Sequence, residues 1–428
     1  MSQKLELGLK ELIAIGVGGM IGGGIFSVMG LAVDITGNAT PIAFLLGGVL
    51  ALIMGYSYVK LAVAFHSDGA SFTYLEYAFP KHKFIGSITG WTVIIGYIGT
   101  MALYAFTFGA YAAELLDSHN DLVRKMLSVG VVLFFMMINL IGTKTLGKTE
   151  DLIVYGKIIL LSILAFAGMQ SVETQNITPL FDKGFISVFM AAALIFVAFE
   201  GFQLITNGVC ETKNPKQNIA RGIYGSIAIV TIIYVVLSVV AVGSLSHEEL
   251  VGAKEYALAV AAEPSMGNAG RVLVSIAALL ATASAINATM FGASRMMAEM
   301  ATEHEMPKAF SFRNREAVPW IAVVTLGILT LCFTYFGGLE LIASFSSLTF
   351  LLVSLAVNIA NYKLRDKTGA NPYYIVLGIL LLLFTIATLL YYLIVHSQQE
   401  LIWIATIYTV IILLEMFNSY PLFKHNDT

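Results

Sequence analysis

The stretch Ile21-Gly22-Gly23-Gly24-Ile25-Phe26 interrupts the first long apolar segment of the chain. Each glycine inside a helix costs about 1 kcal/mol relative to alanine, so three in succession favour local unwinding. A second stretch of this kind, Phe199-Glu200-Gly201-Phe202, lies in the sixth apolar segment. Inside a bilayer, unwound backbone is tolerated only where protein or a water-filled cavity satisfies its polar groups. The two interruptions therefore predict a buried site near the middle of a membrane.

The composition places the chain among polytopic membrane proteins. Of its 428 residues, 58% are hydrophobic and 12% are charged, and the mean hydropathy is +0.83. Short polar loops between the apolar segments predict one membrane domain over residues 1–428. The first segment lacks a small-residue cleavage site, so we expect it to be retained. About twelve segments have the length and composition of membrane-spanning helices, near 9–34, 41–65, 84–116, 122–142, 149–170, 184–211, 219–244, 268–298, 319–337, 339–362, 371–395 and 399–418.

Lysine and arginine are distributed unevenly between the two sides of this arrangement. If the N-terminus lies inside, only Arg124, Lys125, Lys183, Lys254 and Arg271 of the 24 basic residues fall in outer segments. Cytoplasmic loops of membrane proteins carry the excess of Lys and Arg. The distribution predicts an even number of spans in the cell membrane, with both termini cytoplasmic.

The positions of the interruptions predict an internal repeat. Segments one to five occupy residues 9–170, and segments six to ten occupy 184–362. Because five is odd, the second unit enters the membrane from the opposite side, and each unit begins with an interrupted segment, as an inverted repeat requires. Residues 371–418 form a peripheral pair. The loop from Ser246 to Gly267 is expected to form either short helices over the outer vestibule or an ordinary surface loop.

The sequence gives no sign of an enzyme. The two cysteines lie in or beside apolar segments, and the seven histidines lie in loops, at segment edges or in the tail. A phosphate-binding loop, HExxH and GxSxG are all absent from the sequence. A membrane-embedded enzyme would need a cluster of His, Asp or Cys at the midplane. We expect no cofactor or metal other than a coupling ion, and the net charge of −3 points to no nucleic-acid partner.

The first interruption has the electrostatics of a zwitterion receptor. The half-helix that begins at Ile25 directs free N–H groups and a positive dipole end toward the break, which suits a carboxylate. The half-helix that ends near Ile21 offers unpaired carbonyls, which suit an ammonium group. The alternative is that these small residues only allow close helix packing. A mirrored second interruption weighs against that alternative.

Three motifs carry a family resemblance. The stretch Ile21–Phe26 resembles the first-helix signature of the amino acid, polyamine and organocation transporter superfamily. Phe199–Phe202 followed by Glu211-Thr212-Lys213-Asn214-Pro215-Lys216 resembles its sixth-helix signature and the loop after it. Ser294-Arg295 followed by Met306-Pro307-Lys308-Ala309-Phe310 resembles the pattern after the eighth helix, although Glu303-His304-Glu305 departs from the usual acidic-Gly ending.

The resemblance implies an all-α LeuT-like fold with five plus five inverted repeats, interrupted first and sixth helices, and alternating access to a midplane site. Carried over by position, the N–H groups of Gly23, Gly24 and Ile25 would bind a substrate carboxylate. The carbonyls of Met20, Val197 and Glu200 would bind its ammonium. The full set of expected substrate-binding residues is Met20, Gly22, Gly23, Gly24, Ile25, Val197, Phe199, Glu200 and Phe202.

Lys157 is the expected site of proton coupling. It lies too deep in the fifth segment to reach water easily, and a buried ammonium can change its charge state during a transport cycle. Its position resembles a fifth-helix lysine in an archaeal proton-coupled member of the superfamily, which implies that its amine approaches the Gly18 carbonyl and Ser284. The alternative is a lysine in a water-filled vestibule with no coupling role.

Other polar side chains within the apolar segments have more than one possible role. Glu200 either carries the proton, contacts a cationic substrate or is a neutral carboxyl at a helix interface. Lys60 is expected to reach the cytoplasmic surface. Gln203, Asn287 and Thr289 either line the pocket or form interhelical hydrogen bonds.

We therefore expect a proton-coupled symporter of amino acids. The alternatives are an amino acid or polyamine exchanger, a sodium-coupled symporter and, more remotely, a channel.

Overall fold

The computed structural model describes residues 7–67, 70–118, 120–142, 146–303 and 305–418. Across these residues the chain is helical, and the β-type pairing described is an isolated bridge between Leu7 and Thr212. In this bridge the Leu7 N–H donates to the Glu211 carbonyl over 2.8 Å, and the Lys213 N–H donates to the Leu7 carbonyl over 2.9 Å. The segment before the first helix is thus paired with the loop that follows the second interruption.

The helices of the first half coincide with the predicted apolar segments and add short connecting turns. In chain order they are α1 (Leu9–Met20), α2 (Gly24–Thr36), η1 (Gly37–Ala39), α3 (Thr40–Phe65), α4 (Ala70–Ala78), α5 (Lys83–Leu115), α6 (Asp121–Ile141), α7 (Leu146–Gly168), η2 (Met169–Ser171) and α8 (Thr174–Ile177).

The second half begins with the other interrupted segment. Its helices are α9 (Phe185–Leu194), η3 (Ile195–Phe199), η4 (Phe202–Glu211), α10 (Pro215–Ser244), α11 (His247–Gly252), η5 (Lys254–Tyr256), α12 (Ala257–Ala261), α13 (Glu263–Thr302), η6 (Lys308–Ser311), α14 (Trp320–Phe336), α15 (Leu339–Lys363), α16 (Arg365–Thr368), α17 (Pro372–His396) and α18 (Gln398–Asn418).

Nine helical stretches among the described residues are long and apolar enough to cross a membrane. The number is below twelve because α2 and α3 join into one stretch, Gly24–Phe65, and because α14 and the apolar part of α18 are shorter than eighteen residues. The structure therefore supports a polytopic membrane protein, and the count of twelve spans stays a prediction.

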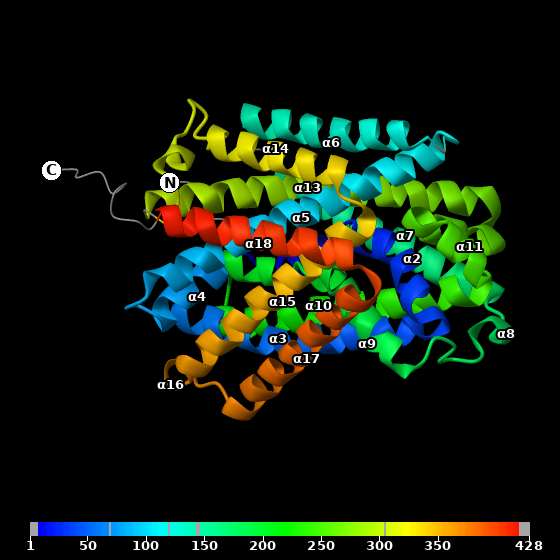
Figure 1. The fold of residues 1–428 in the computed structure, drawn as a ribbon, viewed down its shortest axis with the longest axis horizontal. Coiled ribbons are helices and arrows are strands. Elements are labelled where there is room, and N and C mark those ends of the chain that lie inside the picture. Colours follow the sequence, from blue (N-terminus) through cyan, green and yellow to red (C-terminus); the bar gives the residue numbers. More distant parts are fainter. Residues whose placement is uncertain (1–6, 68–69, 119, 143–145, 304, 419–428) are drawn as a thin grey trace.

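The long helices run roughly along one direction of the molecule, and the short ones gather at its two ends. In Figure 1, α4 and α16 lie at the left end, whereas α8 and α11 lie at the right end. The distribution of lysine and arginine in the sequence assigns α4 and α16 to the cytoplasmic side and α8 and α11 to the outer side. Their separation in space is what a chain that repeatedly crosses a membrane requires.

The long helices pack in two groups that position the site. In the first group α10 packs along α1 and α3, and η4 packs against α1 and α10. In the second group α5 packs along α6, α13 and α15. Tyr111 links α5 to α2, because its buried hydroxyl donates to the Phe26 carbonyl over 3.0 Å.

The loop between α10 and α13 forms short helices, as one of the two sequence interpretations expected. These are α11, η5 and α12. The turn η5 packs directly on α2, where a Cβ on Gly30 would collide with the carbonyl oxygen of Lys254. The loop therefore covers the end of α2.

Candidate functional site

The first interruption separates α1 from α2 by three residues. Regular helix ends at Met20 and begins again at Gly24. A Cβ on Gly23 would lie 2.6 Å from Cδ1 of Tyr104 on α5, so this close approach requires glycine. The Ser27 hydroxyl donates to the Gly23 carbonyl over 2.8 Å, which satisfies one backbone acceptor at the turn.

The second interruption lies between η3 and η4 and touches the first. Gly201 has φ +125°, a conformation that side-chain-bearing residues rarely adopt. A Cβ at this position would lie 2.5 Å from the carbonyl carbon of Gly19. A Cβ on Gly24 would lie 2.7 Å from Cα of Ala198. The backbones of the two interruptions are therefore in direct contact, on both sides of the first break.

One tyrosine joins the two interruptions. The hydroxyl of Tyr234 on α10 lies 2.7 Å from the Met20 carbonyl oxygen and 3.1 Å from the Ala198 carbonyl oxygen. Its ring makes edge contacts with Phe199 and Phe44, at centroid distances of 5.3 and 5.7 Å. A phenol has one hydrogen to donate, so the two carbonyls compete for it.

Hydrogen bonds to α15 also hold the second interruption in place. The Val197 N–H donates to Oγ of Ser347 over 3.0 Å, and the same hydroxyl donates to the Leu194 carbonyl. Ser347 is fully buried, so its oxygen replaces the water that an unwound backbone would otherwise need.

The structure brings the predicted substrate-binding residues together around this contact. All of them are buried, and the apolar side chains among them are at most 2% exposed. The site is therefore closed on both sides in this conformation. The set that lies in this region comprises Met20, Gly22, Gly23, Gly24, Ile25, Val197, Phe199, Glu200 and Phe202.

Lys157 points toward the first interruption from α7. Its side chain is buried, and Nζ donates to the Ile21 carbonyl oxygen over 3.2 Å. We expected the Gly18 carbonyl, so the acceptor lies three residues farther along the chain. The difference arises because α7 crosses α1 at Gly18, where Val154 fills the contact, and the long lysine side chain extends beyond it to the end of α1. The other expected partner, Ser284, is half-buried on α13.

A family model described as amino acid permease matches residues 7–412. The chain belongs to this family. It is 34% identical over 398 residues to an uncharacterized protein of Methanocaldococcus jannaschii, covering 90% of this chain and 89% of the relative. It is 30% identical to the inner membrane transport protein YbaT of Escherichia coli, covering 93% of each. It is also 30% identical to the serine/threonine exchanger SteT of Bacillus subtilis, covering 75% and 74%.

Several polar side chains of the permease lie in helix contacts outside the breaks. Nδ2 of Asn139 donates to Oδ1 of Asn287 over 2.9 Å, so this amide joins α6 to α13. The Lys60 ammonium donates to the Gly369 carbonyl over 3.3 Å, in the loop after α16. These two contacts agree with the interhelical and surface-reaching interpretations. At the second break, by contrast, Nε2 of Gln203 donates to the buried Glu200 carboxyl three residues earlier, so this bond lies within one segment and does not join two helices.

Sequence reasoning missed three residues of the permease site. Tyr104, Tyr234 and Ser347 come from α5, α10 and α15, three helices far apart in the sequence. No local motif marks them, because their role arises only when distant helices pack together. The signal that remains in the sequence is the presence of isolated polar residues in segments otherwise suited to lipid.

Proposed function

We propose that this permease is a proton-coupled secondary transporter of amino acids. The observation that carries the proposal is the backbone contact between the two interruptions, which gathers unwound peptide groups in one buried region. Relatives named for serine and threonine, for branched-chain amino acids and for cationic amino acids support the substrate class. Because these relatives differ in the side chain they are named for, what they share is the α-amino acid backbone.

The architecture we propose is the LeuT-like fold, with twelve spans, an inverted repeat of residues 9–170 and 184–362, and cytoplasmic termini in the cell membrane. The opposite placement of α4 and α11 in Figure 1 supports this topology. The two packed helix groups support it as well, because one group can rock against the other while each stays intact.

In the proposed substrate complex, the N–H groups of Gly23, Gly24 and Ile25 receive the carboxylate. The carbonyls of Met20, Val197 and Glu200 receive the ammonium. Recognition through backbone groups is independent of the side chain, so it suits a transporter of several amino acids. The closed site must open for substrate to enter, which requires α1 and η4 to separate from α5 on one side at a time.

We further propose that Lys157 carries the coupled proton. Its contact with the Ile21 carbonyl ties α7 to the first interruption. Protonated Lys157 donates strongly to this carbonyl, and the neutral amine holds it more weakly. A proton that binds from one side and leaves to the other would therefore strengthen and then relax the contact during each cycle.

The test is uptake of radiolabelled amino acids into proteoliposomes under an imposed pH gradient or an imposed sodium gradient. We expect the pH gradient to drive accumulation, and we expect Lys157→Ala to abolish that drive. Lys60→Ala is the matched control, because it removes a lysine that contacts a surface loop. Full pH-driven uptake by Lys157→Ala would contradict the coupling proposal, and accumulation driven only by sodium would replace it with a sodium symporter.

An exchange mechanism is the second candidate, since one relative is named as an exchanger. Proteoliposomes preloaded with unlabelled amino acid distinguish the two. An exchanger takes up label only when preloaded, whereas a proton symporter accumulates label in empty vesicles with an imposed pH gradient.

A further inference from the structure

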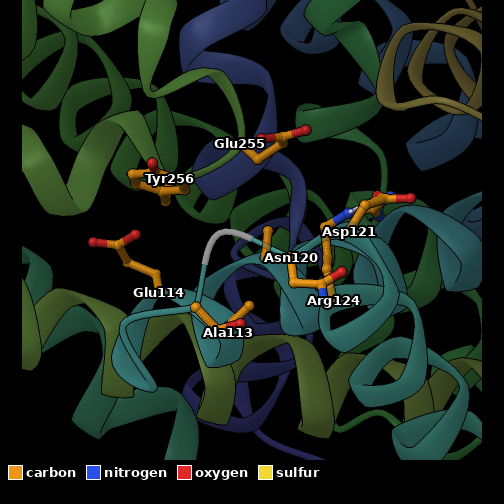
Figure 2. A pocket seen from close by; sticks show the side chains of 9 residues that line it. Ala113, Glu114, Asn120, Asp121, Arg124, Glu255 and Tyr256 are labelled. Carbon is orange, nitrogen blue, oxygen red and sulfur yellow. Dashed lines mark hydrogen bonds and ion pairs between the residues drawn. The ribbon is translucent and has the colours of Figure 1, made fainter.

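A cavity of about 280 Å³ lies away from the paired interruptions, between the end of α5, the start of α6 and η5. Figure 2 shows Tyr256 and Glu114 on one side of it, Asp121 and Arg124 on the other, and Glu255 on a third. Typical small-molecule pockets begin at about 300 Å³, and a free amino acid is smaller than most of their ligands. By the proposed topology, this cavity opens to the outside of the cell.

Four charged side chains line the cavity: Glu114, Asp121, Arg124 and Glu255. Asp121 pairs with both Arg124 and Lys125, so two cations share one carboxylate on that side. Glu114 is already neutralised by an ion pair with Arg271. Arg271 is also shared with Glu263, and Lys125 does not line the cavity, so Arg124 is the cationic side chain of the described lining.

The negative side of the cavity is Glu255. This carboxylate belongs to η5, and within the described part of the chain no cation pairs with it. Burial raises the pKa of the adjacent Tyr256 phenol, and the charge of Glu255 raises this pKa further. A ligand that lies across the cavity would meet the Arg124 guanidinium at one end and the Glu255 carboxylate at the other.

Arg124 also has an unused hydrogen-bond donor. Its Nε donates to Asp121 over 3.1 Å, and its guanidinium carbon lies 4.0 Å from the ring centroid of Phe106. The remaining nitrogen, Nη1, is buried and has no hydrogen-bond partner. A buried donor left without an acceptor is costly, so a ligand carboxylate at this nitrogen would be favourable.

We propose that this cavity is a second, outer binding site for a zwitterionic amino acid, which presents its carboxylate to Nη1 of Arg124 and its ammonium to Glu255. The inference rests on the proposed transport function for its substrate class. Its role would be to hold substrate at the outer face before the paired interruptions open.

The test uses a thiol reporter inside the cavity. Cys210 and Cys332 are exposed and would also react with a maleimide, so both are first replaced by serine. Ser118→Cys then places a thiol in the cavity lining with little change in volume. The reaction rate of this thiol with a membrane-impermeant maleimide is measured on purified protein, with and without a saturating concentration of L-alanine.

We expect L-alanine to slow labelling severalfold, and we expect neither propionate nor ethylamine to do so. Arg124→Gln and Glu255→Gln should each remove the protection. Lys125→Gln is the matched control, because it removes one positive charge next to Arg124. The Lys125 side chain contacts the Tyr335 ring and does not line the cavity. Protection that persists in Arg124→Gln, or that is lost equally in Lys125→Gln, would overturn the proposal, as would labelling that ignores L-alanine.

Uptake under a pH gradient is measured on the same proteins, so failure of the two proposals is distinguishable. If the protein transports amino acids but L-alanine does not protect the thiol, the outer-site proposal is wrong and the proposed transport function stands. Protection without transport supports the outer site and contradicts the proposed transport function.

Discussion

The hydroxyl of Tyr234 donates to the carbonyl of Met20 over 2.7 Å, and this bond connects α10 to the end of α1. The same oxygen lies 3.1 Å from the Ala198 carbonyl on the other interrupted segment. One side chain thus lies within hydrogen-bond distance of backbone acceptors at both breaks, although its single hydrogen can be donated to only one of them at a time. It also occupies the acceptor that the proposed substrate ammonium requires.

Replacing this hydroxyl should impair both stability and transport. Tyr234→Phe leaves a buried carbonyl without its donor, which should cost about 1–3 kcal/mol and lower the melting temperature. Tyr111→Phe is the control, because it removes a similar buried bond from tyrosine to a carbonyl, that of Phe26. We expect both variants to have a lower melting temperature, and we expect uptake to fall further in Tyr234→Phe than in Tyr111→Phe. Equal uptake in the two variants would contradict a special role for Tyr234.

Gly201 should tolerate no side chain. Gly201→Ala adds a Cβ at a positive φ and 2.5 Å from the Gly19 backbone, where neither neighbour is a flexible side chain. The two interruptions would have to separate, so uptake should fall at least tenfold. Gly156→Ala on α7 is the control, because a Cβ there meets nothing within 4 Å and alanine favours helix by about 1 kcal/mol. Uptake assays and thermal melting of both variants decide the point.

Two serines on α15 should respond to substitution in opposite directions. Ser347→Ala leaves the Val197 N–H without its acceptor and should destabilise the protein by about 1–3 kcal/mol. Ser344 lies one turn earlier, and its buried hydroxyl has no hydrogen-bond partner. Ser344→Ala should therefore leave the melting temperature unchanged or raise it. A loss of stability in Ser344→Ala as large as that in Ser347→Ala would refute this assignment.

The bond between Asn139 and Asn287 should be structural, with little effect on substrate recognition. A double-mutant cycle with alanine at both positions should give a coupling energy of about 0.6 kcal/mol, the usual size for interhelical hydrogen bonds in membranes. Apparent KM for uptake should stay within about twofold of the wild-type value in each variant, because the bond joins α6 to α13 and involves neither interruption. A large increase in KM for Asn287→Ala would instead place that amide in the substrate pocket.

The features that the sequence predicted well are local ones. Runs of apolar residues mark the helices, and Gly22, Gly23, Gly24 and Gly201 mark the interruptions, because unwinding depends on nearby residues. Their mutual contact was expected only through the symmetry of the two halves. The structure shows it directly as the approach of Gly201 to Gly19.

The features that the sequence could not predict depend on the packing of distant helices. The acceptor of Lys157 was misplaced by three residues, because its choice depends on where α7 crosses α1 and where α1 ends. Tyr234 and Ser347 escaped notice for a similar reason. A hydroxyl within an apolar segment gives no indication of which neighbouring backbone group it will bond.

The backbone bridge between Leu7 and Thr212 has a practical consequence for anyone who produces this protein. It fastens the beginning of the chain to the loop between η4 and α10, and both belong to the helix group that we expect to rock. By the proposed mechanism, a fusion partner or affinity tag attached ahead of Leu7 would therefore interfere with the helix group that moves. Purification tags and optical probes are better attached after α18, a helix outside the two proposed repeats.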